Sequence, residues 1–216
     1  MDGVILLHGL GRGSRAMRPF EGVAREAGYR TLALDYPSRR ARIGDLAQGL
    51  QDPVARFAEG CKSVHFVAHS MGGLVARTLL KTARPKNLGR VVTLATPHLG
   101  SEVAEFLLKI PPTAWFYGPA LHDLPTLTDE GSRAKFGEID YPLGCITGES
   151  IHNPLFGYFL LPRPNDGTVA ASRARVRGAS DYLPLGVNHT SILWDRSAIR
   201  QTLFFLREGR FKPAVQ

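Results

Sequence analysis

Residues 64–75 read VHFVAHSMGGLV, and this stretch decides the fold of the chain. Its first half predicts a buried strand and its second half a helix. Ser70 lies at the turn between them, with Ala68 two positions before it and Gly72 two positions after. Small residues are needed there because strand and helix pass close together, and the turn holds the serine out above the sheet edge. We expect a nucleophilic serine; the alternative is an ordinary strand-to-helix turn.

Short apolar runs alternate with amphipathic segments of helix length along the rest of the chain, which is typical of βαβ units around a parallel sheet. Strands are expected at Gly3 to His8, Arg30 to Asp35, Val64 to His69, Arg90 to Ala95, Leu143 to Thr147 and Tyr182 to Val187. Helices are expected at Arg15 to Ala27, Ile43 to Glu59, Met71 to Thr82 and Arg196 to Arg207. Ser14 is the expected N-cap of the first helix and Gly28 its end.

We expect residues 1–216 to form a single α/β domain, because 216 residues suffice for one sizeable core but not for two ordinary domains. Residues 101–140 break the alternation and predict an inserted lid or cap. A second irregular stretch runs from Asn153 to Asn165.

The first expected strand leads into His8-Gly9-Leu10-Gly11. In hydrolases, such a loop supplies one N–H group to an oxyanion, and the residue after the nucleophile supplies the other. Leu10 and Met71 are therefore the candidate donors. The competing interpretation is a dinucleotide-binding unit ending at Asp35, but its third small position falls on Ser14.

An acid and then a histidine are required downstream of the serine in this chain order. Asp166, in the turn sequence NDGTV, and His189, after the last expected strand, satisfy that order. Glu149 is the rival acid. We therefore predict Ser70 as the nucleophile, His189 as the general base and Asp166 as the orienting carboxylate.

The chain resembles the lipase-like α/β-hydrolases, which include small bacterial lipases and the inositol-deacylase-like group. The resemblance covers most of the chain and rests, in order, on ILLHGLGR, LDYPSR, VAHSMGG, LATPHLGS, NDGTV and NHTSIL. It implies an α/β-hydrolase fold, hydrolysis of carboxylic esters, often of lipids, and no cofactor. Two departures are Ala68 in place of the usual glycine and a start at the strand bearing the HG loop, which suggests a minimal version of the fold.

Two alternatives stay open at this point: an acyltransferase or thioesterase with the same three residues, and a non-catalytic binding protein of the same fold. Apolar side chains in the two irregular stretches are candidates for acyl-pocket walls or a lid, although they can equally complete the core. They are Trp115, Phe116, Leu155, Phe156 and Phe159.

The net charge is +8, and most of it comes from arginines scattered along the chain. This distribution favours a solvated surface over a nucleic-acid-binding site, and it leaves contact with a membrane surface open. Oligomeric state is not indicated. Cys61 and Cys145 are expected to be reduced thiols. Without a leader or an 18-residue apolar run, we expect a cytoplasmic protein. No metal is expected, because metal-ligand spacing is missing around His65, His69, His98, His122 and His152.

Overall fold

The computed structural model describes residues 1–151 and 154–213, so His152 and Asn153 lie outside the described residues. One sheet of parallel strands has the order β2-β1-β3-β4-β5-β6. The strands are β1 (Gly3–Leu7), β2 (Arg30–Leu34), β3 (Val64–His69), β4 (Leu88–Leu94), β5 (Leu143–Gly148) and β6 (Asp181–Leu185). The predicted parallel α/β architecture is confirmed.

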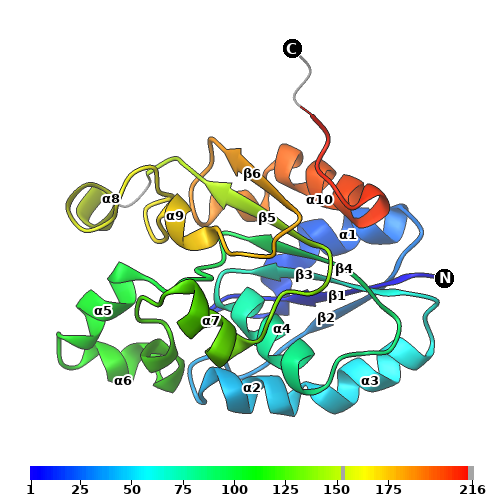
Figure 1. Ribbon diagram of the computed structural model, residues 1–216, viewed down its shortest axis with the longest axis horizontal. Helices are drawn as coiled ribbons and strands as arrows, with labels where there is room; N and C mark the ends of the chain where they lie inside the picture. The colour runs from blue at the N-terminus through cyan, green and yellow to red at the C-terminus, as the bar shows by residue number, and fades with distance from the viewer. Residues whose placement is uncertain (152–153, 214–216) are drawn as a thin grey trace.

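Helices cover both faces of the sheet (Figure 1). One face carries α1 (Arg18–Glu26) and α10 (Arg196–Glu208), and the other carries α2 (Ile43–Gly49), α3 (Gln51–Glu59) and α4 (Met71–Thr82). The inner strands β1, β3 and β5 are buried along their whole length, as expected for a sheet covered on both faces, whereas the edge strands β2 and β6 are partly exposed. Two apolar clusters, one on each face, form the core.

The helix expected over Ile43 to Glu59 is wrong in one respect: it is interrupted at Leu50, which separates α2 from α3. Pro53 has no N–H group and its ring conflicts with the carbonyl four residues earlier, so a continuous helix through Gly49 is disfavoured.

The helix expected over Arg15 to Ala27 is also corrected. Its first turn, Ser14–Met17, is a separate 3-10 helix, and α1 starts only at Arg18. Ser14 does not cap it, because its N–H and hydroxyl donate to the Asp35 carboxylate at 2.6 and 2.7 Å. Gly28 does follow the helix end, with a φ of +87° that glycine adopts without strain.

Shorter helices gather at the carboxyl ends of the strands. In Figure 1, α5, α6 and α8 lie at the end of the sheet opposite the N-terminus. The group comprises α5 (Glu102–Leu108), α6 (Thr113–Tyr117), the 3-10 helix η2 (Pro119–Asp123), α7 (Asp129–Phe136), α8 (Pro154–Phe159), α9 (Ala171–Ala174) and the 3-10 helix η3 (Ser191–Leu193). Together they surround the sheet edge at which α/β proteins place their sites.

Not all of residues 101–140 projects from the core. The α7 segment packs on α4 through Arg77, which is buried and donates to Ser132 Oγ at 2.9 Å and to the Gly137 carbonyl at 2.6 Å. The final part of the segment is therefore tied to the central helix, whereas α5 and α6 stand at the sheet edge. Within the described ranges, no helix is both long and apolar enough to span a bilayer.

Candidate active site

Ser70 has the backbone conformation of a strained strand-to-helix turn, with a φ of +54° that non-glycine residues rarely adopt. The surrounding chain enforces it. Ser70 N–H donates to the Leu94 carbonyl at 2.8 Å, and Thr96 Oγ1 donates to the Ser70 carbonyl at 2.9 Å. The serine hydroxyl is thereby held at the carboxyl edge of β3.

Gly72 makes this turn possible because α4 and the end of β1 almost touch. A Cβ atom on Gly72 would lie 2.5 Å from the His8 carbonyl oxygen and 2.8 Å from that of Leu7. Gly9 has a related role, since its Cβ would lie 3.0 Å from His69 Nδ1 and 3.1 Å from Ser70 Cβ. The two glycines allow the HG loop and the serine turn to lie side by side.

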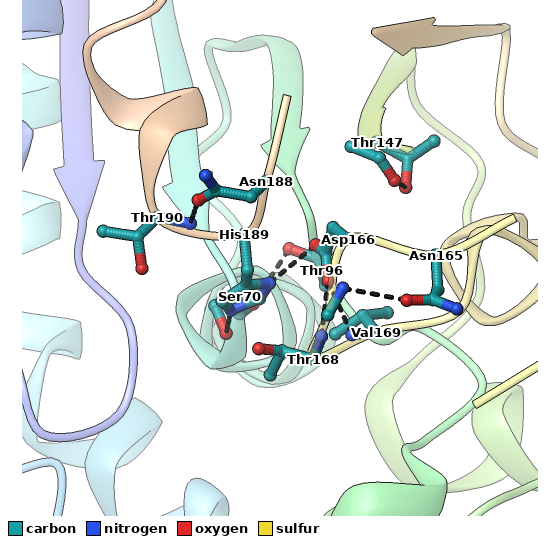
Figure 2. Close-up of polar contacts among 12 residues, drawn as sticks. Ser70, Thr96, Thr147, Asn165, Asp166, Thr168, Val169, Asn188, His189 and Thr190 are labelled. Atoms are coloured by element: carbon teal, nitrogen blue, oxygen red, sulfur yellow. Dashed lines mark hydrogen bonds and ion pairs between the residues drawn. The ribbon is translucent and has the colours of Figure 1, made fainter. Parts of the chain in front are cut away.

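The structure brings together the three residues expected to act on one another. His189 Nε2 lies 3.0 Å from Ser70 Oγ, and His189 Nδ1 lies 2.7 Å from Asp166 Oδ2. Figure 2 shows Ser70 and His189 pointing toward one another, with Asp166 behind the imidazole ring. They come from the β3–α4 turn, the loop after β6 and the loop before α9.

Asp166 is only 1% exposed, and its second oxygen is also satisfied. Oδ1 accepts hydrogen bonds from the N–H groups of Thr168 at 2.9 Å and Val169 at 2.7 Å. The NDGTV turn thus fixes the carboxylate toward the ring, leaving Oδ2 for His189. The rival acid, Glu149, is exposed, and Asp166 is the carboxylate that contacts the histidine.

The HG loop is held by residues of the segment that follows β2. The His8 ring is buried and stacks on Tyr36 with 4.1 Å between ring centroids, and the Tyr36 hydroxyl donates to the His8 carbonyl. Gly11 N–H donates to Ser38 Oγ at 3.0 Å. The LDYPSR segment therefore anchors the loop that leads from β1, and Asp35 is occupied by Ser14 rather than free for a ribose.

Leu10 and Met71, the expected oxyanion donors, both line one cavity together with Ser70. Within residues 1–151 and 154–213, neither of their main-chain N–H groups has an intramolecular acceptor. Met71 is also the first residue of α4, where free N–H groups and the helix dipole favour negative charge. The two N–H groups are thus available to a ligand in the cavity.

The cavity has a volume of about 300 Å³ and opens above Ser70 and His189. Its apolar wall, defined here as five side chains of α5 and η2 and the residue after η2, consists of Val103, Ala104, Leu107, Leu121 and Leu124. Tyr117, Phe156 and Val169 add further apolar surface. Such a site suits an extended apolar group held next to a few polar atoms.

Four of the five residues expected to form pocket walls do not line this cavity. Of that set, only Phe156 does. Trp115 and Phe159 are 85% and 86% exposed, and Phe116 and Leu155 are also exposed. The α6 and α8 helices direct these side chains to solvent. The expectation that they form pocket walls is therefore wrong for Trp115, Phe116, Leu155 and Phe159.

Sequence reasoning missed the apolar wall and two polar lining residues, Arg12 and Thr190. The signal for the wall was present: the apolar positions of α5 follow LATPHLGS directly after β4, hence at the same sheet edge as Ser70. Arg12 follows the HG loop and Thr190 follows His189.

His69 lies beneath the site. Burial of His69 lowers its pKa well below the ordinary value, and the electrostatic effect of the nearby His189 ring lowers it further. His69 Nε2 lies 2.9 Å from the His189 carbonyl oxygen. The described part of the chain has no group of three or more His, Cys, Asp or Glu side chains placed to hold a metal ion.

The chain is similar to several lipases and deacylases. It is 24% identical to GPI inositol-deacylase B of Yarrowia lipolytica over 252 residues, covering 92% of this chain and 24% of that protein. It is 42% identical over 59 residues to a triacylglycerol lipase of Pseudarthrobacter phenanthrenivorans, covering 26% of this chain and 18% of the lipase. This chain thus spans about a quarter or less of the length of these two relatives.

A solved structure agrees on the fold. The mature lipase BlEst2 of Bacillus licheniformis superimposes with a TM-score of 0.73 at 22% identity, covering 96% of this chain and 91% of the lipase. The model of the alpha/beta hydrolase family matches residues 4–203, which include the serine turn and the acid and histidine loops. With the parallel sheet and the serine turn described above, this match shows that the chain belongs to the alpha/beta hydrolase family.

Proposed function

We propose that this protein is a carboxylic ester hydrolase that cleaves lipid or other acyl esters through an acyl-enzyme on Ser70. The observation that carries the proposal is the continuous hydrogen-bonded series Ser70, His189 and Asp166, with separations of 3.0 and 2.7 Å, at the floor of an apolar cavity. Nucleophile, base and orienting acid in this arrangement are the elements of acyl transfer to serine.

Acylation begins when Ser70 Oγ attacks the ester carbonyl carbon and His189 Nε2 accepts the hydroxyl proton. Asp166 keeps the Nδ1 proton of His189 in place and stabilises the imidazolium. The N–H groups of Leu10 and Met71 stabilise the oxyanion that forms on the carbonyl oxygen. When the intermediate collapses, the bond to the alcohol breaks and His189 returns its proton to the departing alkoxide.

Deacylation repeats the sequence with water in place of serine. His189 takes a proton from water, the hydroxide oxygen bonds to the acyl carbon, and the bond to Ser70 Oγ breaks as His189 reprotonates it. The products are an acid and an alcohol. Every proton and leaving group is accounted for by the protein and water, so the reaction needs no cofactor.

The acyl chain is assigned to the apolar wall, whose side chains lie beside Ser70 without a charged group among them. Burying each methylene there contributes about 0.8 kcal/mol to binding. This supports esters with an extended acyl chain, including lipid esters, as substrates.

Contact with a lipid surface is part of the same proposal. Trp115 and Phe159 are almost fully exposed on α6 and α8, the helices flanking the cavity. Aromatic side chains of this kind partition into the interface of a bilayer. Cosedimentation with phosphatidylcholine vesicles should fall for Phe159→Ser. It should stay unchanged for Phe204→Ser, the control, which alters a partly exposed phenylalanine on α10 that does not line the cavity. Equal retention of both variants would contradict the contact.

The decisive experiment is hydrolysis of p-nitrophenyl esters from acetate to palmitate by the native protein and by Ser70→Ala. We expect a burst of p-nitrophenol followed by steady turnover that depends on Ser70. Turnover of acyl thioesters in preference to these esters would favour a thioesterase with the same residues. Activity that survives in Ser70→Ala would contradict the mechanism, and silence with every ester by a folded protein would favour a non-catalytic role.

A further inference from the structure

The cavity above Ser70 carries one permanently charged side chain. Among the described residues that line it, Arg12 is the only arginine or lysine, and none is an aspartate or glutamate. The other polar groups that face it are neutral or are histidines. A ligand in this cavity therefore meets a positive potential that no lining carboxylate offsets.

Arg12 is held at the cavity by a contact between two loops. It lies between Gly11, with a φ of +68°, and Gly13, in the loop that joins β1 to the first 3-10 helix. Its Nη2 donates to Thr190 Oγ1 at 3.1 Å. No carboxylate within the described ranges lies within 4.0 Å of the guanidinium. One of its five N–H donors is engaged, which leaves a planar pair for another acceptor.

The position of Arg12 indicates which part of a substrate it would meet. His189 must return a proton to the departing alkoxide, so the alcohol portion of the ester lies on the His189 side of Ser70. Thr190 follows His189 directly, and Arg12 contacts Thr190. The apolar wall belongs to different elements, α5 and η2. The cavity is thus divided into an apolar acyl side and a cationic alcohol side.

Resting on the proposed function, we propose that Arg12 is a specificity-determining residue that binds an anionic group, a phosphate or a carboxylate, on the alcohol portion of the ester. A guanidinium pairs with either group through two parallel N–H···O bonds. The substrate class is then an acyl ester whose alcohol bears a negative charge close to the scissile bond. The anion stabilises the complex on the leaving-group side while the acyl chain occupies the apolar wall.

A purely structural role for Arg12 makes a different prediction. If the guanidinium only braces the loop that carries His189 through Thr190, its removal impairs neutral and anionic esters alike. If it binds the substrate, the loss depends on the charge of the alcohol. The ratio of kcat/KM values for two esters that differ only in that charge separates the two roles.

Suitable substrates are 1-octanoylglycerol and 1-octanoylglycerol 3-phosphate, each below its critical micelle concentration, with octanoylglycolate as the carboxylate counterpart. The native protein should prefer the anionic esters. Arg12→Gln should lower the anionic-to-neutral ratio of kcat/KM about tenfold, mainly through KM, as for the loss of one charge-assisted hydrogen bond. Arg12→Lys should retain part of the ratio. Arg15→Gln, an exposed arginine outside the cavity lining, is the matched control and should leave it unchanged.

The dependence of the anionic-to-neutral ratio on salt concentration is a second test, because a purely structural role of Arg12 would not make this ratio salt-dependent. Raising the NaCl concentration from 0.02 to 0.5 M, two conditions chosen to span roughly 20 to 4 Å of Debye length, should reduce the preference of the native protein. It should have little effect on the ratio in Arg12→Gln. If Arg12→Gln loses the preference for only one of the two anionic esters, the phosphate or the carboxylate, then that anion is the group that Arg12 binds. If the native protein prefers neither anionic ester over the neutral one, the assignment is overturned.

Binding without turnover separates this inference from the proposed function. The ether analogues 1-O-octylglycerol and 1-O-octylglycerol 3-phosphate cannot be hydrolysed, and their binding to Ser70→Ala can be followed by calorimetry. The phosphate should strengthen binding to Ser70→Ala and not to the Ser70→Ala, Arg12→Gln double variant. If the native protein hydrolyses none of the esters, this binding result would still support the anion site while the proposed reaction is refuted. Equal gains from the phosphate in both variants would refute the anion site, whatever the esterase assays show.

Discussion

His69 Nε2 lies 2.9 Å from the main-chain oxygen of His189, in the loop that carries the expected general base. A carbonyl oxygen can only accept, so His69 bears its proton on Nε2 and donates it. Burial keeps the pKa of His69 well below the ordinary value, so this neutral tautomer persists at neutral pH. The residue before the serine thus ties the serine turn to the histidine loop.

His69→Phe should therefore lower kcat about tenfold with little change in KM, because the donor to the His189 carbonyl is lost while the ring volume is largely kept. Steady-state kinetics on p-nitrophenyl butyrate measure the split. His65→Phe, which changes a buried histidine on the same strand at its opposite end, is the control and should leave kcat unchanged. Equal losses in both variants would indicate general damage to β3.

Asp166→Asn should reduce kcat by about 10⁴. The amide oxygen stays with the N–H groups of Thr168 and Val169, so the NH2 group faces His189 Nδ1 and donates to it, which favours the tautomer whose Nε2 carries the proton and cannot accept another. Glu149→Gln, at the exposed rival position, should keep native kinetics. The two variants compared by burst and steady-state assays decide between the acids. A large loss in Glu149→Gln would reverse the assignment.

Gly72→Ala should destabilise the fold by about 1–3 kcal/mol or more, because the new Cβ would lie 2.5 Å from the His8 carbonyl, and main chain cannot move aside as a flexible side chain can. Urea unfolding monitors the change. Gly22→Ala is the matched control: it lies within α1 with no atom within 4 Å of its Cβ, and should stabilise by up to about 1 kcal/mol. Similar midpoints for the two variants would contradict the close approach.

The sheet could be predicted from the sequence because its signals are local. Each strand is a short apolar run, and every predicted strand end lies within two residues of the observed one. The serine turn was equally readable, since Ala68 and Gly72 reflect a contact between elements adjacent in the chain. The order of Asp166 and His189 followed from the same reasoning, and the structure places both within hydrogen-bond reach of their partners.

The cavity could not be predicted in the same way, because its walls depend on how irregular segments pack. Trp115 and Phe159 look like wall residues by composition, yet short helices present them to solvent. Leu107 lines the cavity because α5 crosses the sheet edge, which periodicity alone does not reveal. Arg12 reaches Thr190 across 178 positions of sequence, a contact that no local pattern encodes.

Leu107→Trp should shift the preference toward shorter acyl chains, because the larger side chain occupies space along the apolar wall. Loss of room for two methylenes corresponds to about 1.6 kcal/mol, so kcat/KM for octanoate should fall about tenfold or more relative to acetate. The p-nitrophenyl ester series measures the profile. Ile110→Trp, at the exposed position after α5, is the control and should keep the native profile. An unchanged profile in Leu107→Trp would place the acyl chain elsewhere.

The buried histidines make the fold sensitive to acid. His98 is buried beside Arg77. Burial, and secondarily the positive charge of Arg77, hold the pKa of His98 well below its ordinary value. Burial lowers the pKa of His69 in the same way. Below pH about 6.5 the unfolded chain binds protons at these residues and the folded chain does not, so the free energy of unfolding decreases as pH falls.

Each histidine of this kind contributes at most about 1.4 kcal/mol of unfolding free energy per pH unit below that value. His98→Gln should therefore flatten the dependence by up to that slope between pH 6.5 and 5, whatever it does to stability at pH 7.5. Urea midpoints measured across this pH range, at unchanged m values, give the pH dependence of the unfolding free energy separately from its value at any one pH. An unchanged slope in His98→Gln would mean that His98 takes up its proton in the folded state, although Arg77 Nη1 lies 3.5 Å from its Nδ1.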